Sequence, residues 1–107
     1  MEFTVLERIV LQVILPEKGN YLTYKVIENL RNDLAFSEKE LKDYELKVGE
    51  TGTTWNSKKE KPKEVEVGDV GLSIIKEALT KLDKEGELNK ENIALYERFI
   101  KNDENGK

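Results

Sequence analysis

The feature that most constrains the fold is an apolar segment near the start of the sequence, between Thr4 and Pro16. Thr4 and Glu7 have the spacing of a capping box, in which a hydroxyl and a carboxylate each accept a hydrogen bond from a free backbone N–H at a helix start. Proline at position 16 is expected to end that helix. Apolar residues recur at helical spacing around most of its circumference: Val5, Leu6, Ile9, Val10, Leu11, Val13, Ile14 and Leu15. Such a helix is expected to lie at the centre of a core or under a partner, and it is too short for the roughly 20 apolar residues of a membrane-spanning helix.

Two more helices are predicted in the first half of the chain. The first covers residues 21–34, and its apolar side is formed by Leu22, Val26, Ile27, Leu30 and Leu34. A second capping box, made by Ser37 and Glu40, begins a short third helix. That helix would direct Leu41 and Tyr44 toward the core.

The apolar spacing then changes from helical to alternating, which indicates strands. Leu46 and Val48 alternate with charged residues, residues 49–52 have the composition of a turn, and residues 53–55 favour a strand. Val65 and Val67 alternate with glutamates in the same way. We expect a small antiparallel sheet of two or three strands with Trp55 as its largest apolar residue, and an exposed, mobile loop over residues 56–63.

The last third of the chain predicts two helices. Asp69 is expected to cap the fourth helix, and Gly86 to end it; its core face would be Leu72, Ile75, Leu79 and Leu82. The fifth helix follows Asn89–Asn92 and places on one face Ile93, Tyr96, Phe99 and Ile100.

The predicted fold class is therefore α+β and mostly helical, with about five helices and one small antiparallel sheet. We expect one compact domain over residues 1–101 and a disordered tail over residues 102–107. Three helices followed by a hairpin is also the order of elements in a winged-helix module, although the match is one of order only.

Composition narrows the classes of function. The chain has no histidine and no cysteine, so it lacks the usual near-neutral general base, the thiolate nucleophile and most transition-metal ligands. No catalytic motif is present. The carboxylates of Glu64, Glu66 and Asp69 are best explained as outward-facing residues, because no recognisable cation-binding loop surrounds them. We expect a protein without catalysis, cofactor or metal, and the absence of cysteine fits a reducing cytoplasm.

Charge and aromatic residues supply the candidate binding sites. With 18 basic and 22 acidic residues the formal net charge is −4, which disfavours a general nucleic-acid coat and leaves room for a local basic patch. Tyr24 and Trp55 are candidates for contact with a protein partner, because exposed tyrosine and tryptophan are common in binding hot spots. A lysine-rich segment over residues 58–63 is the candidate for phosphate contacts in a winged-helix-like arrangement: Lys58, Lys59, Lys61 and Lys63.

Three parts of the sequence together resemble a group of small phage and prophage proteins of Firmicutes. They are residues 1–31 (MEFTVLERIVLQVILPEKGNYLTYKVIENLR), residues 53–56 (TTWN) and residues 71–100 (GLSIIKEALTKLDKEGELNKENIALYERFI). The resemblance carries no catalytic residues. It implies a protein made in the cytoplasm of an infected bacterium, where small non-enzymatic proteins often bind host or phage machinery.

Two functions follow as expectations. The preferred one is a small intracellular protein that binds another macromolecule, either a protein partner or a second copy of itself, through the apolar face of the first helix. The alternative is a winged-helix-like DNA-binding regulator that uses the lysine-rich segment.

Overall fold

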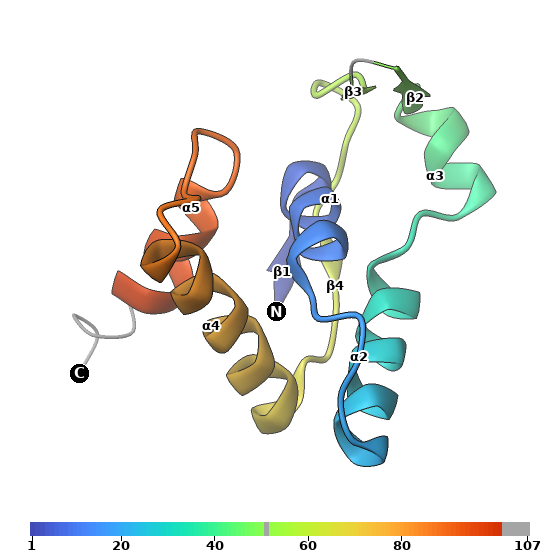
Figure 1. The fold of residues 1–107 in the computed structure, drawn as a ribbon. Coiled ribbons are helices and arrows are strands. Elements are labelled where there is room, and N and C mark those ends of the chain that lie inside the picture. Colours follow the sequence, from blue (N-terminus) through green and yellow to red (C-terminus); the bar gives the residue numbers. More distant parts are fainter. Residues whose placement is uncertain (51, 102–107) are drawn as a thin grey trace.

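Helix α1 (Val5–Ile14) lies at the centre of the fold, where its apolar sequence predicts it (Figure 1). The computed structural model describes residues 1–50 and 52–101. Helices α2 (Tyr21–Leu34) and α4 (Gly68–Lys84) both contact α1 and each other. Helix α5 (Ile93–Tyr96) continues into η1 (Glu97–Lys101), a π-helical turn, and both pack on α4. The predicted α+β class is confirmed, since the described part of the chain has five helices, is mostly helical (56%) and contains small antiparallel sheets.

The two predicted capping boxes are confirmed. Thr4 Oγ1 accepts a hydrogen bond from the Glu7 amide at 3.2 Å, and Glu7 Oε1 accepts one from the Thr4 amide at 2.9 Å. Ser37 and Glu40 form the same pair of bonds at the start of α3 (Glu38–Asp43). The predicted cap at Asp69 is wrong: α4 begins at Gly68 after Val67, without a side-chain cap. Asp69 lies in the first turn, where a carboxylate still interacts favourably with the helix dipole.

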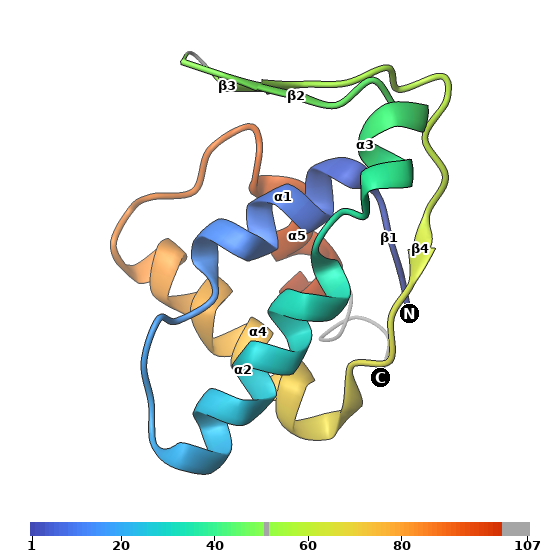
Figure 2. The ribbon, with the colours of Figure 1, turned by 90° about the vertical axis from the view of Figure 1, so that its right-hand side faces the viewer.

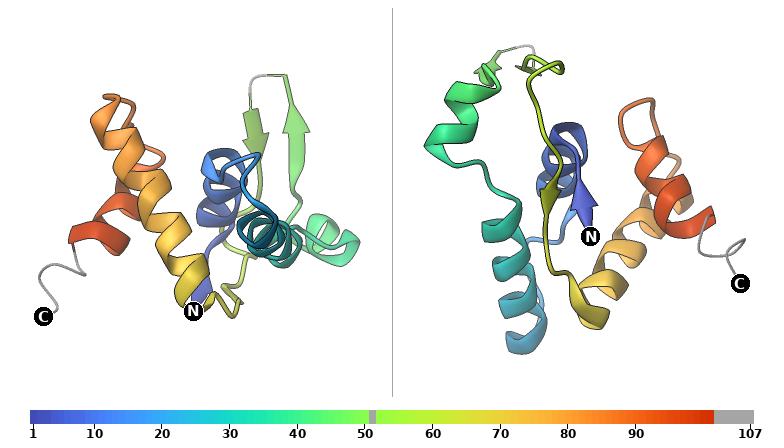
Figure 3. Two further views of the ribbon diagram at one scale, coloured as in Figure 1. Left: turned by 60° about the horizontal axis from the view of Figure 1, so that its bottom comes forward. Right: turned by 180° about the vertical axis from the view of Figure 1, so that it is seen from behind.

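The strands form two separate sheets and not the single sheet of two or three strands that the alternation predicts. Strands β2 (Lys47–Gly49) and β3 (Gly52–Thr54) form the expected hairpin. The strand predicted around Val65 lies slightly earlier in the chain. It is β4 (Lys63–Glu64), which pairs with β1 (Glu2–Phe3) beside the start of α1 (Figure 3). Residues 65–67 are therefore not a strand. The Val65 amide donates to the Met1 carbonyl at 2.8 Å, and its side chain enters the core.

One cluster of buried side chains joins α1, α2, α4, α5, η1 and the β1–β4 pair. Its fully buried members include Phe3, Leu11, Leu34, Ile75 and Leu79. Several predicted core positions lie outside it: Leu22, Leu41 and Ile93 are exposed, and Tyr44 is only partly buried. In the last helix Phe99 is buried as predicted, and Leu95 is buried while Ile93 is not.

The remaining sequence-based expectations on overall organisation concern membranes and the tail. Within residues 1–50 and 52–101, no helix combines the length and the apolar character that crossing a membrane requires. The predicted disordered tail, residues 102–107, lies outside the described residues.

Candidate functional site

The outer side of α1 and the β2–β3 hairpin face each other across a groove. Figure 2 shows the hairpin extending over α1, and the connection between α4 and α5 rising at the left of α1 toward the hairpin. The groove has a volume of about 460 Å³. We call it the α1–hairpin groove and define it by its lining residues, which are Leu6, Ile9, Val10, Val13 and Ile14 of α1, Gly52, Thr53 and Trp55 of the hairpin segment, and Asn89, Glu91 and Asn92.

The groove is most apolar along α1, and Trp55 is the apolar residue on its hairpin side. Val13, in the α1 side, has 77% of its surface exposed. Val48 is paired with Thr53 in the hairpin, and directly paired residues project from the same face of an antiparallel sheet. Trp55 follows Thr53 by two positions and projects to that face as well. Val48 is 82% exposed but does not line the groove, so Val13 is the lining valine that is left in contact with water.

Trp55 and Glu60 attach the hairpin segment to α1. The Trp55 indole N–H donates to Glu60 Oε1 at 3.1 Å, and Glu60 Oε2 accepts from the Val5 amide at 2.8 Å. That amide belongs to the first turn of α1, where backbone donors lack helical partners and a carboxylate is favoured by the helix dipole. Glu60 thus holds the tryptophan at the groove while it caps the helix that forms the groove's other side.

The base of the hairpin is fixed to α3. The Leu46 amide donates to the Leu41 carbonyl at 2.9 Å, and the Asn56 amide donates to the Tyr44 carbonyl at 2.8 Å. These bonds lie at the two ends of the hairpin, before β2 and after β3. They join both ends of the hairpin to the α3 segment.

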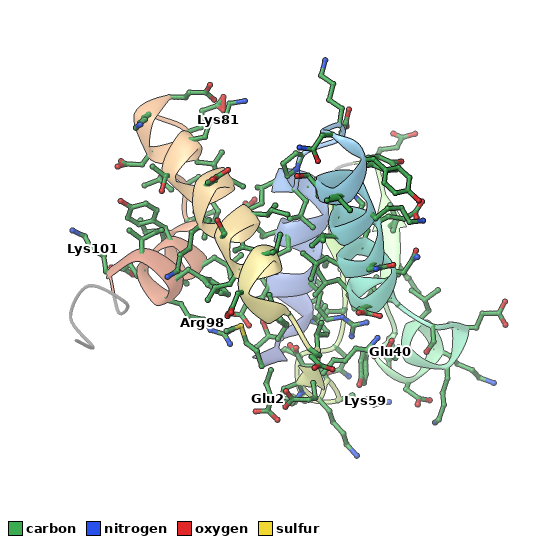
Figure 4. The ribbon with its side chains drawn as sticks, turned by 90° about the horizontal axis from the view of Figure 1, so that it is seen from below. Glu2, Glu40, Lys59, Lys81, Arg98 and Lys101 are labelled. Atoms are coloured by element: carbon green, nitrogen blue, oxygen red, sulfur yellow. The ribbon has the colours of Figure 1, made fainter. Side chains whose placement is uncertain are left out.

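Arg8 positions α1 from its buried side. Its guanidinium is fully buried and donates to the carbonyls of Leu34 and Ala35, at 3.0 and 2.7 Å, and to both carboxylate oxygens of Glu40, at 2.8 and 3.0 Å. It also lies 4.0 Å from the centroid of the Phe36 ring. The last carbonyls of α2 have no helical donor, so Arg8 satisfies them and joins α1 to the α2–α3 connection. Figure 4 shows Glu40 at that connection.

Arg31 makes the reciprocal connection, from α2 to the end of α1. From α2 it donates to the carbonyls of Gln12 and Leu15, at 2.7 and 2.8 Å, at the end of α1. The Gln12 side-chain amide returns a bond of 2.7 Å to the Arg31 carbonyl. Each of the two helices is therefore capped at its C-terminal end by an arginine from the other, which fixes the direction in which the outer side of α1 faces.

The Arg8–Glu40 pair predicts a specific acid sensitivity. Hydrogen bonds from the Arg8 guanidinium are the main cause that lowers the pKa of Glu40 from 4.5 to about 2. Because the pKa is lower in the folded protein, the stabilisation is complete above about pH 4.5 and is lost as the pH falls toward 2. Glu40→Gln resembles the protonated side chain at every pH. We expect the difference in free energy of unfolding between the wild type and Glu40→Gln, measured with urea, to shrink from pH 6 to pH 3, whereas a constant difference would contradict this assignment.

Tyr24, the other aromatic candidate, is not in the α1–hairpin groove. It lies near the start of α2, 43% exposed, in a shallow hollow with Pro16, Glu17 and Glu28. Tyr24 and Trp55 were both predicted as contacts for a protein partner. The structure places them at separate sites.

The lysine-rich segment does not form a wing. It connects β3 to β4, which belong to different sheets, because β4 pairs with β1. Lys59, labelled in Figure 4, forms an ion pair with Glu45 at 2.7 Å, and Lys63 donates to the Asp33 carbonyl. Lys58 and Lys61 are exposed, and their ammonium groups have no partner among the described residues. The four lysines thus divide between internal contacts and solvent, and their role in nucleic-acid binding stays a prediction.

The arginines are unavailable for reading bases. The chain has three, and besides Arg8 and Arg31 there is Arg98, which donates to Glu7 Oε2 and to the Glu2 carbonyl, both at 2.8 Å. All three guanidiniums hold the fold together. Bidentate contacts to guanine, the commonest specific contact to DNA, would require breaking those bonds.

Sequence reasoning did not identify Glu60 or the Asn89–Asn92 segment as parts of a site. Val13 was included only as one member of the wide apolar stripe of the first helix, which was predicted to meet a partner because some of its members lack a neighbour within the fold. No signal identified Glu60, because its role depends on contacts with residues 5 and 55 that only the folded chain brings together.

The residues that line the groove are mostly apolar or uncharged. Glu91 is the only charged side chain among its lining residues, so the groove presents shape and apolar surface rather than paired acids or bases. Comparison with known proteins adds no assignment, as no family model, curated protein or solved structure significantly matches the chain.

Proposed function

We propose that this protein is a small, non-catalytic binding protein that holds an apolar part of another protein in the α1–hairpin groove. The observation that supports this most directly is the exposure of Val13, 77%, on the apolar α1 side of a groove whose other side carries Trp55. Single exposed apolar residues are common on soluble proteins. One that lies in a groove lined by further apolar residues and a tryptophan marks a surface suited to a partner.

The energetic argument concerns water. Burying a valine side chain fully contributes about 1.5 kcal/mol or more, so covering Val13 would supply roughly that amount before any other contact forms. The hydrogen bonds of Leu46 and Asn56 fix both ends of the hairpin to the α3 segment, and Val13 stays exposed beside it. A partner can therefore bury Val13 without first opening the fold.

The resemblance to small phage and prophage proteins suggests where the partner is found. It favours a host or phage protein in the bacterial cytoplasm. A second copy of this chain is the other occupant that an apolar helix face would accept, and sedimentation separates the two because self-association depends on protein concentration.

Val13→Lys tests the proposal. A lysine at this exposed position leaves the core intact but places a charge on the apolar side of the groove. We expect affinity capture from bacterial lysate, quantified by mass spectrometry, to retain a protein on the wild type that is lost on Val13→Lys. Leu22→Lys is the matched control, because Leu22 is 76% exposed on α2 and outside the groove. Capture profiles that do not differ between Val13→Lys and Leu22→Lys would contradict the proposal.

A further inference from the structure

The hairpin presents a free strand edge beside the apolar side of the groove. Gly49 and Gly52 are paired across positions 50 and 51, and the residues that close such a short loop exchange hydrogen bonds with each other. Hydrogen-bonded and non-hydrogen-bonded pairs alternate along an antiparallel ladder. Val48 and Thr53 are therefore a non-hydrogen-bonded pair, whose N–H and C=O groups point away from the hairpin's own ladder.

Thr53 is the member of that pair that lines the groove. Among the described residues, no backbone or side-chain hydrogen bond from outside the hairpin reaches its backbone. Its N–H and C=O thus form a donor and an acceptor next to Trp55 and α1. Natural proteins usually cover or disrupt such edges, since they pair readily with another chain.

We infer that the groove takes an extended segment of a partner protein, which adds a strand to the outer edge of β3 and places every second side chain on α1. The inference rests on the proposed function and specifies the class of partner. A partner helix would fill the apolar space, but its backbone groups are already paired within the helix, so the Thr53 groups would stay unpaired. An extended segment satisfies them and also presents side chains to one face at alternate positions.

The composition of the segment follows from the groove. Its inward residues are apolar, because they meet Ile9, Val13 and Trp55. The end of the segment that lies next to Glu91 carries lysine or arginine, since that carboxylate is the only charge among the lining residues. Proline is excluded at the position that donates to the Thr53 carbonyl, because proline has no N–H.

A random dodecapeptide library displayed on phage tests this directly. The wild-type protein is the bait, and peptides that also bind Val13→Lys are removed. We expect enriched peptides with apolar residues at alternate positions, a flanking basic residue and no proline among the alternating positions. A synthetic copy of the best peptide with N-methyl groups on alternate amides should bind at least tenfold more weakly when those amides face β3, and equally well when the other set is methylated.

Each of the other possible outcomes would contradict a different part of the proposal. Enriched peptides with apolar residues three and four positions apart, or equal binding by both methylated copies, would overturn the extended segment while leaving the groove as a binding site. A dimer of the wild type that Val13→Lys abolishes would assign the groove to a second copy instead. If no peptide is enriched once those that bind Val13→Lys are removed, both this inference and the proposed function are overturned. Circular dichroism of Val13→Lys confirms that the variant is folded.

Discussion

Arg8→Met is expected to lower the free energy of unfolding by about 3–5 kcal/mol, because removing one partner of a buried ion pair leaves the other uncompensated. Arg8 has no exposed surface, and it satisfies the carbonyls of Leu34 and Ala35 as well as Glu40. Methionine keeps most of the volume of the arginine stem but donates no hydrogen bond. The lost stability therefore reports the polar contacts rather than a cavity.

Urea unfolding followed by circular dichroism measures this effect. Lys39→Met is the control, since Lys39 forms an ion pair with Asp43 on the exposed surface of α3, and its side chain is 84% exposed. Exposed pairs of this kind contribute about 0.5 kcal/mol or less. If Arg8→Met changed the free energy of unfolding as little as Lys39→Met does, Arg8 would not join α1 to α2 and α3 in the way described above.

Leu79→Ala is expected to cost about 2–5 kcal/mol, the range for removing a buried leucine side chain and leaving a cavity. Leu79 lies on α4 with no exposed surface and belongs to the cluster that joins α4 to α1, α2 and η1. The surrounding helices are tied to one another by the contacts of Arg8, Arg31 and Arg98, so they have little freedom to move inward. We therefore expect a value in the upper half of that range.

Thermal and urea unfolding of Leu79→Ala would be compared with Leu22→Ala. Leu22 is 76% exposed, and surface substitutions generally change stability by no more than about 0.5 kcal/mol. Similar values for the two variants would mean that the core is not organised around α4 as the structure has it.

Local signals in the sequence predicted most of the elements. Both capping boxes consist of residues three positions apart, and helical spacing of apolar residues requires nothing beyond the helix itself. The hairpin is equally local, because its strands are joined across two positions. The β1–β4 pair was missed for the opposite reason: Phe3 pairs with Lys63, and strands of two residues are too short to show an alternating pattern.

The buried arginine shows a signal that was present but not used. Arg8 is in helical phase with Val5, Leu11 and Leu15, all buried, so the chain places a charge on the apolar face of its most apolar helix. Its partner Glu40 could not be predicted, because Glu40 already had a local role in the α3 capping box. The ion pair between Glu40 and Arg8 depends on where α2 places α3 relative to α1.

The candidate site was predicted only in part. Trp55 and the apolar first helix were identified separately from the sequence, and the structure brings them to the same groove. Their proximity depends on Glu60, which accepts from both Trp55 and Val5, and on the separation of the hairpin from β4. Neither follows from local patterns, since both depend on long-range contacts.

The most direct test of the central claim is the dissociation constant of the captured partner for the wild type, Val13→Lys and Leu22→Lys, measured by calorimetry. If the α1–hairpin groove is the binding surface, Val13→Lys should weaken binding by roughly 30-fold or more, the loss expected for a hot-spot residue, and Leu22→Lys should leave it nearly unchanged. Equal dissociation constants for all three proteins would show that the partner binds elsewhere.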